Sequence, residues 1–231
     1  VPSVHPYLLM SFLGKTRDVM TLAHELGHGI HQRLSARQGY LMAHSPLTFA
    51  ETASVFGEML TFRALLDQEK DPEIRRMLTA QKVEDMINTV VRQTAFHQFE
   101  TTVHNERRNG ELSSGRLAEI WHTVQQESLG DAFRFTPEYD PYWSYISHFF
   151  HSPFYVYAYA FGDCLVNALY TVYQETDDKA GFVEKYTHML TLGGTQTHRD
   201  MLAPFGLDAT DRNFWKKGLK VLEDFIDELE E

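Results

Sequence analysis

The chain has 231 residues, 43% of them hydrophobic and 23% charged, which is enough for one domain with a well-buried core or for two small ones. A formal net charge of −11 argues against nucleic acid as a partner, because phosphate binding needs a basic face. No apolar stretch is long enough to span a bilayer, no signal-peptide pattern opens the chain, and a single cysteine excludes an internal disulfide. We therefore expect a protein without a membrane partner and with a cytoplasmic location.

Apolar residues recur at helical spacing along nearly the whole chain, and strand patterns are scarce. The sequence therefore predicts a mainly α fold with several helices. Because no repeat or flexible linker divides the chain, residues 1–231 are expected to form a single α-helical domain. In chain order, helices are expected at about 19–38, 47–67, 71–108, 114–128, 152–175, 179–192 and 211–230, with an aromatic loop at 133–143.

A candidate metal site lies in the first expected helix, where residues 24–28 read H-E-x-x-H. His24 and His28 are four residues apart, so one helical turn places both imidazoles on the same face. Glu25 sits beside them, where it can accept a proton from a zinc-bound water. Glycine at positions 27 and 29 weakens a helix, and the close approach of another segment is a reason to tolerate it. The apolar residues just before the motif predict that this helix is buried.

A third ligand is predicted at Glu51, in the second expected helix. Its neighbours are small or apolar, so the side chain is expected to face inward, and a buried carboxylate is costly unless it is paired or binds a metal. Glu58 follows seven residues later on the same helix face. It is either a carboxylate that hydrogen-bonds a ligand imidazole or a solvated surface residue. His31 is interpreted as an ordinary core or surface histidine rather than a group that orients a ligand.

Three segments together resemble one family of peptidases. They are residues 21–32 (TLAHELGHGIHQ), residues 49–54 (FAETAS) followed by Glu58, and residues 148–162 (HFFHSPFYVYAYAFG). Residues 192–195 (LGGT) and 206–208 (GLD) add a match near the C-terminal end. The combination resembles the M3 family of zinc oligopeptidases, most closely its oligoendopeptidase F branch, over nearly the whole chain.

The resemblance implies an α-helical catalytic domain of the zincin type that cleaves internal bonds of short peptide substrates. It implies one Zn²⁺ per chain, bound by His24, His28 and Glu51, with Glu25 as the general base. It also implies that a histidine and one or two tyrosines of the third segment stabilise the oxyanion. Members of the family extend far upstream of the H-E-x-x-H motif, so this chain is expected to be a C-terminal catalytic part whose upstream N-terminal portion is absent.

The third segment also has a chemical interpretation of its own. Preorganised O–H or N–H donors stabilise the negative charge that develops on a carbonyl oxygen under attack by water. Tyr155 and Tyr159 are four residues apart and share a helix face if the helix includes both, while His148 is expected in the preceding loop. The residues alone favour simple core packing for these aromatics, whereas the resemblance favours a catalytic role. Tyr157 and His151 are reserve candidates.

Other functions remain open alternatives. A different H-E-x-x-H hydrolase, such as an aminopeptidase, needs acidic residues that recognise a free amino terminus, and none can be assigned. Thermolysin-like enzymes carry an acidic residue soon after the third ligand, where this chain has Val55. A non-catalytic zinc-stabilised helical module has no use for Glu25 as a base. An interaction module without metal requires His24, His28 and Glu51 all to be incidental.

Overall fold

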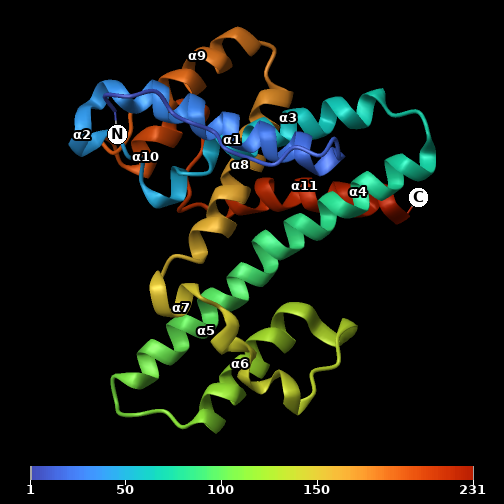
Figure 1. Cartoon of the computed structure of the whole chain (residues 1–231), viewed down its shortest axis with the longest axis vertical. Helices are drawn as coiled ribbons and strands as arrows, with labels where there is room; N and C mark the ends of the chain where they lie inside the picture. The colour runs from blue at the N-terminus through green and yellow to red at the C-terminus, as the bar shows by residue number, and fades with distance from the viewer. Residues whose placement is uncertain (1, 231) are drawn as a thin grey trace. The chain divides into compact units, whose positions relative to one another are not determined.

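The structure, a computed structural model, describes residues 2–230, and no strand occurs among them. The mainly α prediction is confirmed. None of the helices in this range is long and apolar enough to cross a membrane. The α-helices are α1 (Thr16–Ser35), α2 (Gly39–Met42), α3 (Thr52–Gln68), α4 (Pro72–Met86), α5 (Arg92–Arg107), α6 (Ser114–Leu129), α7 (His148–His151), α8 (Tyr157–Glu175), α9 (Lys179–Leu190), α10 (His198–Leu202) and α11 (Arg212–Glu230) (Figure 1).

Shorter helical turns complete the backbone. A π-helical turn, η3 (Ile87–Val91), joins α4 to α5, so the long helix expected at 71–108 is present with one local change of winding. The remaining turns are of the 3-10 type and are η1 (Ala36–Gln38), η2 (Leu47–Phe49), η4 (Gly130–Ala132), η5 (Pro137–Tyr145) and η6 (Ala203–Phe205).

Two sequence predictions about the segments between α6 and α8 are wrong. The segment 133–143 is not simply a loop, because Pro137–Tyr145 winds into η5, where Tyr139 packs on the Trp121 ring at a centroid distance of 5.7 Å. The helix expected from Ser152 begins only at Tyr157 and is preceded by the short α7. The Ser-Pro pair is typical of a helix start, but Phe154 has a φ of 60°, which no right-handed helix accommodates.

The chain forms two compact units. Unit 1 comprises Val1–Val83 and Gly162–Glu231, and unit 2 comprises Glu84–Phe161. Unit 2 is therefore an insertion in the sequence of unit 1, and each unit is described by itself.

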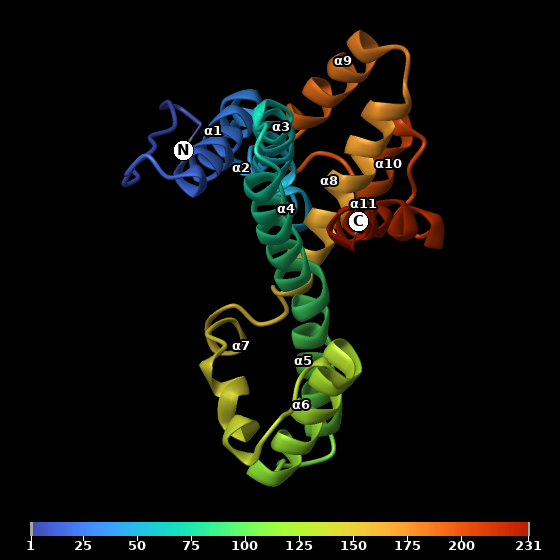
Figure 2. The same cartoon turned by 90° about the vertical axis from the view of Figure 1, so that its right-hand side faces the viewer.

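In unit 1, α1 and α3 lie side by side, as Figures 1 and 2 both show. Glycines allow the close contact. A Cβ at Gly27 would lie 2.5 Å from both the Ala53 carbonyl oxygen and the Ser54 Cα, and one at Gly57 would lie 3.2 Å from the Ala23 carbonyl oxygen. The close approach expected at Gly27 is thus present, whereas a Cβ at Gly29 would meet only side chains, at 3.7 Å. The apolar residues that precede the H-E-x-x-H motif are half-buried rather than fully buried.

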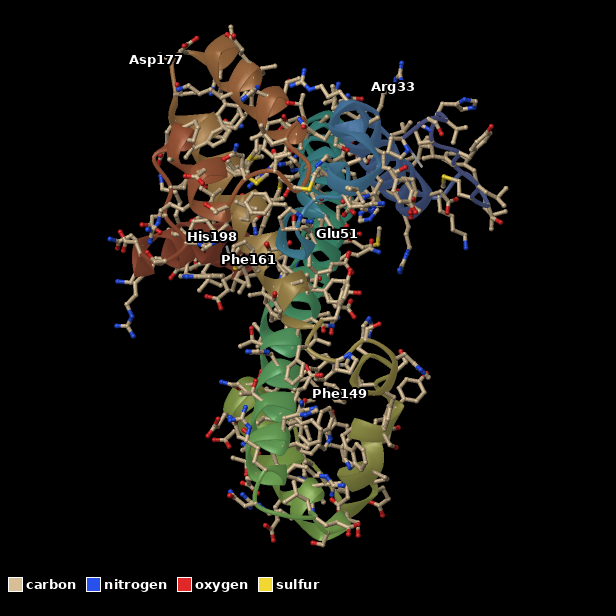
Figure 3. The ribbon with its side chains drawn as sticks, turned by 90° about the vertical axis from the view of Figure 1, so that its left-hand side faces the viewer. Arg33, Glu51, Phe149, Phe161, Asp177 and His198 are labelled. Atoms are coloured by element: carbon tan, nitrogen blue, oxygen red, sulfur yellow. The ribbon has the colours of Figure 1, made fainter. Side chains whose placement is uncertain are left out.

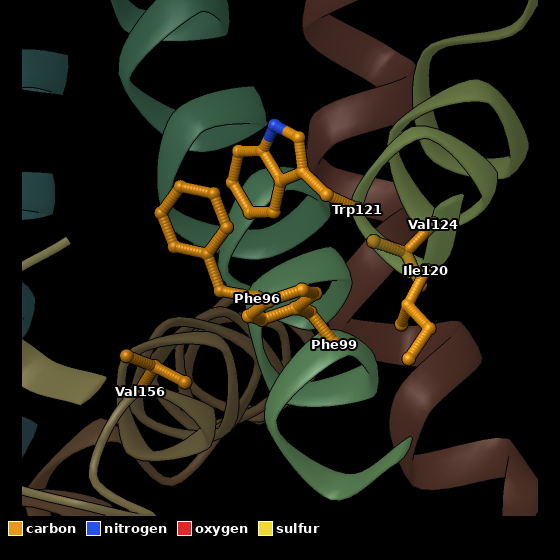
Figure 4. Close-up of a cluster of buried hydrophobic side chains, with 6 residues drawn as sticks. All are labelled: Phe96, Phe99, Ile120, Trp121, Val124 and Val156. Carbon is orange, nitrogen blue, oxygen red and sulfur yellow. The ribbon is translucent and has the colours of Figure 1, made fainter. Parts of the chain in front are cut away.

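The core of unit 2 forms where α5, α6 and the segment just before α8 meet. Figure 4 shows its buried side chains, among which Phe99 packs edge-on against Trp121 at a centroid distance of 5.3 Å. Val156 is fully buried in the same cluster, so the segment that leads into α8 is anchored there. The cluster consists of Phe96, Phe99, Ile120, Trp121, Val124 and Val156.

A buried carboxyl group, Asp163, lies in α8 within unit 1. Its Oδ2 accepts a 2.8 Å hydrogen bond from Asn167. Burial raises the pKa of Asp163 to about 6, against the attraction of the buried Lys82 and the hydrogen bond from Asn167. Between pH 4 and pH 6 the folded state therefore binds more protons at Asp163 than the unfolded chain does, and this residue's contribution to stability is lost as pH rises through that window.

Replacing this carboxyl group, as Asp163→Asn, is expected to stabilise the protein at pH 8 by up to about 3 kcal/mol, because a carboxyl group with a pKa of about 6 is held unfavourably in its charged form at that pH. The advantage over wild type should shrink as pH falls and be absent at pH 4. Urea denaturation of both proteins at several pH values measures it. A difference in unfolding free energy that stays constant from pH 4 to pH 8 would contradict the assignment of this titration to Asp163.

Candidate metal centre

Helix α1 presents His24 and His28 from successive turns. The helix starts where the Asp18 carboxylate accepts hydrogen bonds from the backbone N–H groups of Leu13 (2.7 Å) and Lys15 (2.9 Å). Both histidines are half-buried and stand at an angle, with ring centroids 4.7 Å apart and planes at 82°. This is the one-face arrangement that the four-residue spacing predicts.

Three donor atoms converge in unit 1. His24 Nε2 and His28 Nε2 are 3.1 Å apart, and each lies 3.3 Å from Glu51 Oε2. Tetrahedral zinc with bonds of about 2.0–2.1 Å requires its ligand atoms to be roughly 3.3 Å apart. The donor set therefore fits zinc in spacing and in kind. Within residues 2–230 this is the only group of three histidine, cysteine or acidic side chains close enough to hold a metal ion.

Glu58 contacts the far side of the His24 ring. Its Oε1 pairs with His24 Nδ1, which leaves Nε2 of the same ring turned to the other two donors. Burial lowers the pKa of His24, but the hydrogen bond to Glu58 and the charges of Glu58, Glu51 and Glu25 outweigh burial and raise it overall. Of the two interpretations of Glu58, the contact favours the carboxylate that orients a ligand imidazole over a solvated surface residue.

Glu51 lies in the turn just before α3. A 3-10 turn, η2, begins at the expected residue 47, but the α-helix itself begins only at Thr52. Figure 3 labels Glu51 in unit 1 beside α1, consistent with its distances to both histidines. Ser54 donates a hydrogen bond of 2.8 Å to Glu51 Oε2. Burial raises the pKa of Glu51, while hydrogen bonds from His28 and Ser54 and the nearby imidazoles lower it by more. The carboxylate form is therefore favoured.

Two further residues support the turn that carries Glu51. The Tyr186 hydroxyl, from α9, donates a 3.0 Å hydrogen bond to the Thr52 carbonyl oxygen. A Cβ at Gly162, in α8, would lie 3.6 Å from Glu51 Cβ. Sequence reasoning missed Ser54 and Tyr186. Ser54 follows Glu51 by three residues within the FAETAS motif, so its contact could have been inferred from that spacing. No pattern near Tyr186 in the sequence indicates its contact with Thr52.

Glu25 and His31 lie on the same helix as His24 and His28. Glu25 is half-buried, one residue from His24. His31 is 6% exposed and is not part of the three-donor group. Burial and the nearby His28 lower the pKa of His31 to about 4, with Glu51 opposing. His31 is therefore a neutral buried histidine near pH 7, in line with the interpretation as a core residue.

In unit 2, His148, Tyr155 and Tyr159 form a compact aromatic group. His148 Nε2 is hydrogen-bonded to the Tyr159 hydroxyl at 3.1 Å, and the Tyr155 ring lies 5.2 Å from Tyr159 and 5.7 Å from His148. All three are half-buried. His148 begins α7 instead of lying in a loop, and Tyr155 precedes α8, so the shared helix face is not the reason why the two tyrosines meet.

The reserve candidates lie outside this aromatic group. Tyr157 packs against His97 of α5, with ring centroids 5.6 Å apart, and His151 is exposed at the end of α7.

The chain matches a known protein family and several known proteins over almost its whole length. Residues 2–221 match the model of peptidase family M3. The oligopeptidase PepF of Bacillus subtilis is 31% identical over 98% of this chain, which spans 34% of that protein. An oligoendopeptidase F homolog of Borreliella burgdorferi is 30% identical over 97% of this chain, which spans 38% of that protein.

A solved structure of a similar protein has a similar fold. The crystal structure of oligoendopeptidase-F from Enterococcus faecium is 28% identical, with a TM-score of 0.76 over 93% of this chain and 39% of that one. The chain thus spans little more than a third of the length of the relatives it matches. Its helical fold, its motifs and the match to the family model over residues 2–221 establish that the chain belongs to peptidase family M3.

Proposed function

We propose that this chain is the zinc-binding catalytic part of a metalloendopeptidase that hydrolyses internal bonds of short peptides. The observation that carries the proposal is the convergence of His24 Nε2, His28 Nε2 and Glu51 Oε2 within 3.3 Å of one another. Membership in peptidase family M3 and the names of the relatives support peptide substrates. In this proposal residues 1–231 act as one catalytic domain and form part of a longer enzyme.

Each side chain has a distinct task in the proposed reaction. His24, His28 and Glu51 hold Zn²⁺, and Glu58 fixes the His24 ring through Nδ1. Zinc, when bound, supplies a Lewis acid that polarises the peptide carbonyl and makes water more acidic. Glu25 accepts a proton from the attacking water on its carboxylate and passes it to the leaving amine. Two histidines and one carboxylate leave a coordination position open, as catalytic zinc sites do.

The aromatic group of unit 2 is proposed to stabilise the oxyanion. The carbonyl oxygen of the peptide becomes negatively charged as water adds, and hydrogen-bond donors placed in advance stabilise that charge by about 3–4 kcal/mol each. Tyr159 and His148 are the principal donors in this proposal, and Tyr155 is the third. Their mutual contacts hold the donor groups in one arrangement before substrate binds.

The test is to measure zinc content and cleavage of a quenched fluorescent oligopeptide together, on the wild type and on Glu25→Gln. We expect one zinc per chain in both proteins. Cleavage by Glu25→Gln is expected to be about 100- to 10,000-fold slower, because the general base is lost while the ligands remain. A matched control is Glu73→Gln, an exposed residue of α4, which should cleave like wild type.

Three results would decide against parts of the proposal. Equal cleavage by wild type and Glu25→Gln would remove Glu25 from the mechanism. Zinc binding without cleavage by either protein would decide against catalysis by these residues alone, and would indicate that they carry the metal site and need the upstream portion of the longer enzyme for catalysis. Failure to bind zinc after reconstitution would refute the metal site itself.

A further inference from the structure

Phe154 has an unusual backbone conformation. Its φ of 60° is the only positive value at a non-glycine position in residues 2–230. The left-handed region is unfavourable for a bulky L-residue, and such strain persists only where the surrounding structure enforces it. Phe154 immediately precedes Tyr155, so the contacts that enforce its conformation also set the course of the chain into the aromatic group.

The Phe154 backbone is hydrogen-bonded to Glu100 in α5. Glu100 is 2% exposed, and its Oε1 accepts a 2.7 Å hydrogen bond from the Phe154 backbone N–H. The other carboxyl oxygen, Oε2, is also buried and has no hydrogen-bond partner among the described residues. Glutamate is seldom buried in this way, because a desolvated polar atom without a partner is unfavourable. Stability alone does not explain a glutamate at this position.

Two further contacts fix the segment on either side of Tyr155. The Phe154 ring packs on His104, one turn along α5 from Glu100, with centroids 4.6 Å apart. Val156 is fully buried in the core of unit 2 (Figure 4). Tyr155 lies between these two fixed residues and remains half-exposed against Tyr159.

We propose that Glu100 is a positioning residue for the aromatic group, holding the backbone at Phe154 so that Tyr155 and Tyr159 meet His148 in one fixed geometry. The inference rests on the proposed function, in which these three side chains stabilise the oxyanion. Glu100 touches none of the reacting atoms in this proposal. Its effect passes through one backbone hydrogen bond, and that bond needs an acceptor oxygen but no negative charge.

Two substitutions separate positioning from a structural role. Glu100→Gln keeps an oxygen acceptor for the Phe154 N–H, whereas Glu100→Met keeps the length of the side chain and removes the acceptor. Because the carboxyl group is buried with one oxygen that has no hydrogen-bond partner among the described residues, Glu100→Met is expected to fold with a Tm at or above that of wild type. Glu84→Met, at an exposed position of α4, is the matched control.

The zinc-loaded proteins are compared by kcat, KM, zinc content and amide hydrogen exchange. Glu100→Met is expected to lower kcat by about 10- to 100-fold, since small displacements of catalytic groups have effects of that size. Its zinc content and KM should match wild type, and its Phe154 amide should exchange faster. Glu100→Gln should restore both kcat and amide protection.

Wild-type kcat in Glu100→Met would overturn the proposal. So would a Glu100→Gln protein that protects the Phe154 amide but is as slow as Glu100→Met, or a Glu100→Met protein that does not fold. If the wild type itself does not cleave peptides, the proposed function fails separately. Hydrogen exchange then still decides whether Glu100 holds the segment, and equal Phe154 exchange in wild type and Glu100→Met rejects it.

Discussion

Gly27→Ala is expected to separate α1 from α3 and to weaken both folding and metal binding. The added methyl group would meet two backbone atoms, the Ala53 carbonyl oxygen and the Ser54 Cα, each at 2.5 Å. Backbone cannot move aside as a flexible side chain can, so the helices themselves must shift. We expect the free energy of unfolding to fall by about 3 kcal/mol or more and Tm by about 6–12 °C. Thermal unfolding followed by circular dichroism measures both.

The same displacement should reduce zinc affinity. Glu51 lies at the N-terminal end of α3 and both histidines lie on α1, so separating the two helices moves the proposed ligands apart. Gly29→Ala is the matched control on the same helix, since its methyl group would lie 3.7 Å from the side chains of Leu8 and Pro6. It should leave zinc affinity unchanged and raise helix stability by up to about 1 kcal/mol. Equal Tm and zinc affinity for the two variants would show that the close helix contact has no role at the site.

Glu51→Gln is expected to abolish stable zinc binding and, with it, all peptide cleavage. A neutral amide is a far weaker zinc ligand than a carboxylate, and two imidazoles alone do not complete a catalytic site. We expect zinc content to fall from one per chain to nearly none after gel filtration. Elemental analysis gives the content, and competition with a chromophoric chelator gives the affinity, which should drop by more than the 10- to 100-fold typical of losing an outer contact.

Thermal unfolding with and without chelator separates the loss of metal from damage to the fold. A bound metal stabilises the folded state by mass action, so chelation should lower the Tm of wild type and leave that of Glu51→Gln unchanged. The amide can still accept the Ser54 hydrogen bond, so the two metal-free proteins should have similar Tm values. Glu51→Gln that retains one zinc per chain would remove Glu51 from the ligand set.

The sequence predictions succeed for features that depend on residues close together in the chain. His24 and His28 share a face because of a four-residue spacing, and the inward direction of Glu51 could be inferred from its small and apolar neighbours. The family resemblance is confirmed over almost the whole chain. The roles of Glu25, His148, Tyr155 and Tyr159 stay predictions, since geometry places them without testing the chemistry.

The features that sequence reasoning missed depend on partners far along the chain. Ser152 and Pro153 are typical of a helix start, but the backbone that follows is held by Glu100, more than 50 residues earlier, and the helix begins five residues late. Tyr186 reaches Thr52 across 134 residues. No local pattern encodes such a contact, because burial and hydrogen bonding of these side chains are decided only when distant segments of the chain come together.

That long-range support has a consequence for the order in which the protein can mature during synthesis. The three proposed zinc ligands lie between residues 24 and 51 and therefore leave the ribosome before unit 2, which is complete at Phe161. The turn that carries Glu51 acquires its remaining neighbours only when Gly162 and Tyr186 have been made. Domains fold as they emerge from the ribosome. The inserted unit 2 can therefore fold before Gly162 and Tyr186 complete the packing around the turn that carries Glu51.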